Sequence, residues 1–200
     1  YYLNRTSTES MFSDAQLYEN INRIVKLVGY NPIGRQTSIL TFKCSAEGDM
    51  PNGLYTIPRY SYLNIGPVSY SVNEDITFYK SVSGETEYLE DISTNKLLYQ
   101  GRFVEYPVYT ATGDENELVY LVPGDNILID HFNIYVYVQD VNDGKWYEWT
   151  RTNSLYLENS NDMKYEIRMN DNLRYELKFG NDINGKRLNK NDKVAIYYLK

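Results

Sequence analysis

Apolar positions near the start of the chain recur at intervals of three and four residues, the spacing of one face of an α-helix. This stripe consists of Leu17, Ile21, Ile24, Val25 and Val28. Ser13 and Gln16 have the spacing of a capping box, in which each side chain satisfies a backbone N–H group of the first turn. Gly29 and Pro32 end the helix. We therefore expect a helix over residues 14–28 whose apolar face is covered by the protein itself or by a partner.

Beyond this helix the spacing of apolar positions changes to two, which is typical of β-strands. From Ile134 to Val138, aliphatic side chains alternate with Tyr135 and Tyr137, so one face is aliphatic and the other aromatic. Strands are expected over residues 39–44, 60–65, 68–72, 76–79, 103–109, 118–122, 134–138, 146–150, 165–169, 175–179 and 194–199. The turn at 48–53 and the polar stretches 83–95 and 113–117 are expected to be loops. The pattern predicts a mainly β (α+β) fold, in which an N-terminal amphipathic helix precedes an antiparallel β-sandwich or irregular barrel-like sheets.

A polar stretch in the middle of the chain, Gly113-Asp114-Glu115-Asn116, indicates where the strands divide. We expect a helical segment over residues 1–36, a first β region over 37–112 and a second β region over 113–200. The chain begins with Tyr1 and shows no signal region, so we expect a fragment of a longer protein.

The balance of charge restricts the partners. Twenty basic and 27 acidic residues give a net charge of −7, the wrong sign for gripping phosphate groups. No stretch approaches the roughly 20 apolar residues that a membrane-spanning helix needs. Neither nucleic acid nor a membrane is expected as a partner. The 22 tyrosines instead indicate half-buried strands and protein interfaces.

The residues that bind metals are scarce. His131 is the only histidine and Cys44 the only cysteine, so a zinc site is not expected. We expect His131 to face solvent or to cap a turn. Residues 181–185 place oxygen-bearing side chains at alternate positions, as in a calcium loop, but the closing glutamate is missing. A glycine-ended loop between two strands is favoured over an ion site.

No catalytic set stands out either. The acidic pairs Glu115 with Glu117 and Asp140 with Asp143 lie in loop-like segments without apolar neighbours to raise a pKa. A glycosidase dyad is left open at these positions, but nothing marks one, and no nucleotide-binding glycine motif is present. We expect no enzyme activity, no cofactor, no metal ligand and no small-molecule substrate.

Two motifs at opposite ends of the chain belong together. Near the end, Phe179, Gly180, Asp182 and Gly185 form an aromatic-glycine turn with a second glycine, followed by a strand that carries Tyr197. Near the start, the helix stops at Gly29, Tyr30 and Pro32. Both motifs resemble baseplate wedge subunits of contractile-tailed (T-even-type) phages and their baseplate J-like relatives.

Two shorter segments between these motifs agree with the same family. Thr56-Ile57-Pro58 is similar to its Ile-Pro start of a strand, and Tyr99-Gln100-Gly101 to its glycine-marked link between strands. The chain departs from the family at Asn181-Asp182, where Asp-Gly is usual, and at Leu188-Asn189, where a proline is common.

This resemblance implies a structural role. Such subunits dimerise and join neighbouring wedge proteins into the inner baseplate ring, which rearranges when the tail sheath contracts. The expected partners are other baseplate wedge proteins and a second copy of the chain. The expected location is the tail baseplate of the virion, assembled in the host cytoplasm.

Two other classes of function stay open. A carbohydrate- or receptor-binding β-domain of a phage tail is the main alternative, because the run from Trp146 to Trp149 offers aromatic rings that can stack on sugars. A glycoside hydrolase that uses unrecognised carboxylates is the other.

Overall fold

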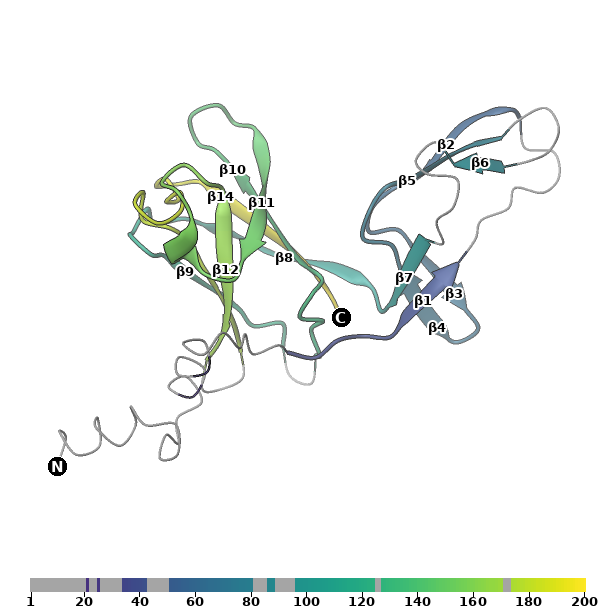
Figure 1. Cartoon of the computed structure of the whole chain (residues 1–200), viewed down its shortest axis with the longest axis horizontal. Coiled ribbons are helices and arrows are strands. Elements are labelled where there is room, and N and C mark those ends of the chain that lie inside the picture. The colour runs from purple at the N-terminus through teal and green to yellow at the C-terminus, as the bar shows by residue number, and fades with distance from the viewer. Residues whose placement is uncertain are drawn as a thin grey trace. The chain divides into compact units, whose positions relative to one another are not determined.

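The described part of the chain is almost entirely β. The computed structural model describes residues 34–42, 51–80, 86–88, 96–124, 127–170 and 174–200, together with Ile21 and Val25 (Figure 1). These residues cluster into two compact units. Unit 1 includes Glu105–Ile127 and Ile134–Tyr197, and unit 2 consists of Arg35–Val104, Leu128–Asn133 and Tyr198–Lys200. The expectation of a mainly β protein with antiparallel sheets is confirmed.

The expected N-terminal helix lies almost wholly outside the described residues. Ile21 and Val25 are both helical and half-buried. Leu17, Ile24 and Val28, which share their predicted face, are outside the described residues, as are Gly29, Tyr30 and Pro32 of the predicted helix stop. The helix therefore stays a prediction. Within the described residues, no helix has the length and apolar character needed to cross a membrane.

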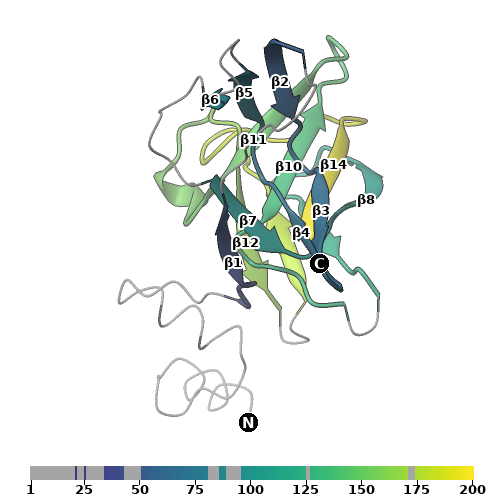
Figure 2. The same cartoon turned by 90° about the vertical axis from the view of Figure 1, so that its right-hand side faces the viewer.

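A seven-stranded sheet forms most of unit 1. In spatial order its strands are β8 (Phe103–Thr110), β14 (Lys193–Leu199), β10 (Ile134–Gln139), β11 (Trp146–Thr152), β12 (Lys164–Met169), β13 (Tyr175–Lys178) and β9 (Leu118–Leu121). The sheet curves into a nearly closed, barrel-like form. Strands β10, β11 and β12 run side by side in it (Figure 2). β11 and β12 are parallel and are joined through the short 3-10 helix η1 (Leu155–Leu157), whereas β12 with β13 and β13 with β9 are antiparallel.

The alternation of buried and half-buried residues along β10 shows which face of the sheet belongs to the core. In β10 the aliphatic residues Ile134, Val136 and Val138 are buried and the tyrosines between them are half-buried, which confirms the predicted faces. Successive side chains of a strand point to opposite faces, so one face becomes the inside of the sheet. Trp149 and Phe179 meet edge to face inside it, with ring centroids 5.4 Å apart.

Unit 2 contains two smaller sheets. The first has the order β1 (Ile39–Phe42), β7 (Lys96–Gln100), β4 (Val68–Ser71) and β3 (Tyr62–Ile65). The second has the order β2 (Gly53–Ile57), β5 (Ile76–Lys80) and β6 (Thr86–Tyr88). Val72, Ile76 and Leu98 form a buried cluster in this unit.

Three of these strands do not follow from the apolar pattern. β2 and β7 were not expected, and β6 lies within the polar stretch 83–95 that was expected to be a loop. β2 and β6 pair with the two edges of β5, whose residues Ile76, Phe78 and Lys80 are buried. Pairing with a buried strand satisfies backbone N–H and C=O groups whatever the side chains are. The expectation of a loop is therefore wrong at Thr86–Tyr88.

A bulge and a tight turn shape strand β3. Both Tyr60 N–H and Ser61 C=O bond to Val72, so two residues oppose one, and Tyr60 takes a positive φ of 71° there. The hairpin from β3 to β4 turns through Gly66 and Pro67 alone. Gly66 has φ 60°, and proline cannot adopt a positive φ, which leaves the type II′ turn favoured in hairpins.

Candidate functional site

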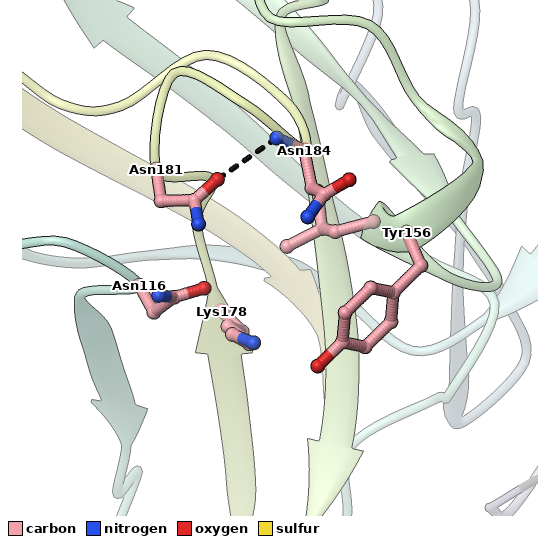
Figure 3. A pocket seen from close by; sticks show the side chains of 6 residues that line it. Asn116, Tyr156, Lys178, Asn181 and Asn184 are labelled. Atoms are coloured by element: carbon pink, nitrogen blue, oxygen red, sulfur yellow. Dashed lines mark hydrogen bonds between the residues drawn. The ribbon is translucent and has the colours of Figure 1, made fainter.

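A shallow pocket opens in unit 1 beside the loop that follows β13. It has a volume of about 120 Å³ and is lined by Asn116, Leu155, Tyr156, Lys178, Asn181 and Asn184. Lys178 is the last residue of β13 and lies between Asn116 and Tyr156 (Figure 3). Leu155 and Tyr156 come from η1, so three separate parts of the chain build the pocket.

Residues 180–185, which we call the glycine loop, form one wall. The Asn181 Oδ1 atom accepts hydrogen bonds from the backbone N–H groups of Ile183 (3.1 Å) and Asn184 (2.8 Å). The Asp182 N–H donates to the Gly185 carbonyl at 3.0 Å, and Asp182 Oδ1 accepts from the Arg187 N–H at 2.9 Å. The side chains of Asn181 and Asp182 thus hold the shape of the loop through its own backbone.

Gly180 and Gly185 both lie where the space for a Cβ atom is already filled by neighbouring atoms. A Cβ atom on Gly185, which has φ 78°, would lie 2.9 Å from the Leu155 Cδ2 atom. The Lys186 N–H donates to the Asp162 carbonyl at 2.9 Å. The glycine loop is therefore packed directly against η1 and the segment after it, which fixes the width of the pocket.

Asn116 forms the opposite wall from an uncommon backbone conformation. Its φ is 56°, and its N–H donates to the Gly180 carbonyl at 3.1 Å. Asn tolerates positive φ better than most residues. The next residue, Glu117, is buried and accepts hydrogen bonds from the Tyr109 hydroxyl, the Thr112 N–H and the Gly113 N–H. This carboxylate holds the turn that presents Asn116.

The electrostatics of the pocket centre on Lys178. Burial lowers the pKa of the Lys178 ammonium, and the charge of Arg168 lowers it further, while Glu166 opposes the change. The Lys178 Nζ atom lies 5.8 Å from the centroid of the Tyr156 ring. None of the six lining residues is acidic. The pocket therefore offers one cation together with amide and hydroxyl groups, and no carboxylate.

The motif residues from the sequence lie around this pocket or away from it. Phe179 is fully buried in the core of unit 1, and Gly180, Asp182 and Gly185 belong to the glycine loop. Tyr197 lies on β14, where its ring meets Tyr137 edge to face at 5.8 Å. Burial, together with a hydrogen bond to Glu105, raises the pKa of Tyr197.

The sequence pattern did not single out Asn116, Tyr156 or Lys178. Asn116 stands in a polar stretch expected to be a loop, and that expectation is confirmed for residues 113–117. Lys178 occupies one position in the alternating pattern of β13. Nothing local to these residues shows that they meet, because their proximity comes from the pairing of β13 with β9 and from the packing of η1.

The glycine loop lies between two strands, β13 and β14, where the sequence predicts a loop. The oxygen atoms of Asn181 and Asp182 already accept backbone hydrogen bonds. Among the described residues, no three His, Cys, Asp or Glu side chains gather as a metal ion would require.

Other candidate residues lie elsewhere. Of the two expectations for His131, the solvent-facing one is wrong, because the residue is only 2% exposed. Its backbone N–H donates to the Arg35 carbonyl. Asp143 accepts a hydrogen bond from the Tyr147 hydroxyl, which lowers the pKa of the Asp143 carboxyl. Trp149 is 3% exposed, so it cannot stack on a sugar beside the exposed Trp146. Alternation along β11 puts these two rings on opposite faces.

The chain was compared with protein-family models and with curated proteins. No family model matches the chain, and no curated protein matches it.

Proposed function

We propose that this chain is a structural subunit of a phage tail baseplate wedge, which dimerises and joins neighbouring wedge proteins into the inner baseplate ring. The motifs around Gly180 and Gly185, and those at Gly29 to Pro32, support this proposal through their resemblance to that family. The observation that carries it is the amount of uncovered apolar surface on the four-stranded sheet of unit 2.

Both faces of that sheet expose large apolar side chains. The strand registers place Leu40, Leu63 and Ile65 on one face, and Ile39, Leu97 and Tyr62 on the other. Each of these six side chains is more than one-third exposed. Large exposed apolar side chains on one sheet favour association with another protein. A subunit whose role is to be covered by its neighbours has this property.

Strand β3 adds an open edge to this surface. It is an outer strand among the described strands, and its sequence Tyr62-Leu63-Asn64-Ile65 carries no charge and no proline. The Ser61 carbonyl accepts a hydrogen bond from Val72, the residue after β4, so alternation turns the N–H and C=O groups of Tyr62 and Asn64 away from β4. Natural edges that avoid pairing usually carry a charge, a proline or a bulge. The bulge of this edge lies before β3, at Tyr60 and Ser61, and leaves Tyr62–Ile65 regular.

A second copy fits this edge. If two β3 strands pair antiparallel about a two-fold axis at Leu63, then Tyr62 of each copy bonds to Asn64 of the other. The two Leu63 side chains then meet at a closely spaced pair, and no like charges face each other.

Sedimentation equilibrium tests the dimer. We expect the chain to self-associate at micromolar to millimolar concentration, and Leu63→Lys to weaken association roughly tenfold or more, because a lysine at the edge opposes strand pairing. Leu54→Lys is the matched control, since Leu54 is also an exposed leucine (60% against 37% for Leu63) but lies on β2 in the other sheet. A wild-type chain that stays monomeric throughout this range would contradict the proposed dimer.

Electron microscopy tests the location. Gold-labelled antibodies raised against this chain should bind contractile-tailed particles at the end of the tail where the baseplate lies. Labelling confined to the head or the sheath of such particles would remove the baseplate role.

A further inference from the structure

We propose that the pocket beside the glycine loop receives an acidic side chain from a neighbouring protein subunit, whose carboxylate meets Lys178 and Asn181 while its adjoining apolar residues pack on Tyr156. The inference rests on the proposed function for the identity of the neighbour. The pocket itself is defined by contacts within unit 1 alone.

The orientation of the Asn181 amide is the first argument. Its Oδ1 atom is engaged by two backbone N–H groups, so its Nδ2 group is the part left to face the pocket, towards Lys178 and Asn116 (Figure 3). An amide N–H₂ group and a lysine ammonium are both donors. A carboxylate can accept from both, one oxygen for each donor, and its charge strengthens both hydrogen bonds.

Charge supports the same ligand. The chain carries a net charge of −7, yet the lining of this pocket holds one lysine and no acidic residue. Arg168 and Glu166 both act on Lys178 electrostatically, with opposite signs, and Glu166 forms an ion pair with Arg168 at 3.2 Å. A partly buried ammonium gains when an opposite charge comes near, because burial has removed part of its water. An incoming carboxylate supplies that charge.

The size and rim of the pocket favour a protein as the source of the carboxylate. About 120 Å³ is below the 300–1,000 Å³ typical of small-molecule sites and suits a single side chain. Tyr156 is 74% exposed, and its neighbour Leu157 is 83% exposed. Ile183, within the glycine loop, is 73% exposed. These are the most exposed large apolar side chains in the described part of the chain, and a free small acid would leave them uncovered.

The walls are held in place before any partner arrives. Asn116 and Asp182, on opposite sides of the pocket, are two of the four described residues other than glycine with positive φ. Their conformations are fixed by hydrogen bonds to Gly180 and Gly185. Strained backbone persists where its surroundings hold it, and a rigid site loses less entropy on binding.

The test uses two short peptides as probes in an NMR titration of the whole chain. Acetyl-Leu-Glu-Leu-amide carries the carboxylate between apolar residues, and acetyl-Leu-Gln-Leu-amide is its neutral match. We expect the acidic peptide to shift the side-chain amide signals of Asn181 and Asn184 and the ring signals of Tyr156. The neutral peptide should bind roughly fivefold more weakly, the most that one partly exposed ion pair supplies.

Variants identify the cation. Lys178→Met should weaken binding of the acidic peptide to the level of the neutral peptide, and Lys178→Arg should restore it. Lys145→Met is the matched control, because Lys145 is exposed in the turn before β11 and does not line the pocket. Circular dichroism of each variant shows that the fold is intact.

Three results would overturn the inference. These are equal binding of the two peptides, loss of binding in Lys145→Met as large as in Lys178→Met, and binding of sodium glucuronate as tight as that of the acidic peptide. The last result would indicate a site for a small acid or an acidic sugar. The titration needs no phage particle, so its failure leaves the antibody labelling unaffected, and failure of the labelling leaves the pocket unaffected.

Discussion

Gly180 lies so close to Gly185 that a Cβ atom on Gly180 would stand 2.1 Å from the Gly185 carbonyl oxygen. No real Cβ atom approaches backbone at this distance, and the atom it would meet belongs to the main chain of the glycine loop. Gly180 also accepts the hydrogen bond that holds Asn116. One missing side chain thus allows the loop, the turn at Asn116 and the pocket between them to exist together.

Replacing Gly180 by alanine should therefore unfold the glycine loop. We expect Gly180→Ala to destabilise the protein by about 3 kcal/mol, near the upper end for a forced backbone shift, and to broaden the signals of Asn116 and Asn181. Chemical denaturation followed by fluorescence measures the loss of stability.

Gly144→Ala is the control for this substitution. Gly144 also has a positive φ of 68°, but a Cβ atom there would meet nothing within 4 Å. Gly144→Ala should lower the free energy of unfolding by only about 1–2 kcal/mol, because alanine is less stable than glycine at a positive φ. If the two variants lose the same stability, close packing at Gly180 is not what matters.

The two tryptophans of β11 should respond very differently to substitution. Trp149 is buried against Phe179, and its replacement by alanine should lower the free energy of unfolding by about 3–5 kcal/mol. Trp146 is 47% exposed on the same strand, so Trp146→Ala should change stability by less than about 1 kcal/mol. Urea unfolding curves of the two variants provide the comparison, and similar losses would contradict the placement of Trp149 in the core.

Tyr109 should titrate at unusually high pH. Burial, followed by the hydrogen bond to Glu117, raises the pKa of the Tyr109 hydroxyl from 10.0 to about 12. The folded protein then keeps a proton that the unfolded chain loses, so this group's contribution to stability is fully present below pH 10 and disappears as the pH rises towards 12.

NMR of ¹³Cζ-labelled tyrosine measures this titration directly. Tyr109→Phe identifies the signal and should remove that part of the alkaline loss of stability. Glu117→Gln should move the pKa of Tyr109 down towards 10 but not fully, since burial is the larger cause. An ordinary pKa for Tyr109 in the intact protein would contradict both the burial of its hydroxyl and its bond to Glu117.

Asp130 should be among the least replaceable residues of unit 2. Its buried carboxylate accepts hydrogen bonds from the N–H groups of Thr37, Phe132 and Asn133 and from the Asn133 side chain. Asp130→Ala leaves these donors without their acceptor and should cost about 2–4 kcal/mol. Thermal unfolding followed by circular dichroism checks it. Asp114→Ala, which removes one exposed bond to Thr112, should be nearly neutral and serves as the control.

The apolar pattern alone determined the fold class and much of its core. In β10, alternation of branched aliphatic residues with tyrosine correctly predicts which side chains are buried, because a strand turns successive residues to opposite faces whatever its neighbours are. The turns at Gly66 and in the glycine loop also follow from local chemistry, since glycine, asparagine and aspartate adopt conformations that other residues resist.

Only the tertiary structure decided which residues share the pocket and which segments without an apolar pattern become strands. β6 is a strand because it pairs with β5, and its three residues are too few to show an alternating pattern. Trp149 is buried although its sequence neighbours suggested an open aromatic face. Asn116, Tyr156 and Lys178 meet because β9, η1 and β13 are brought together by contacts far apart in the chain, and a local pattern carries no information about such distances.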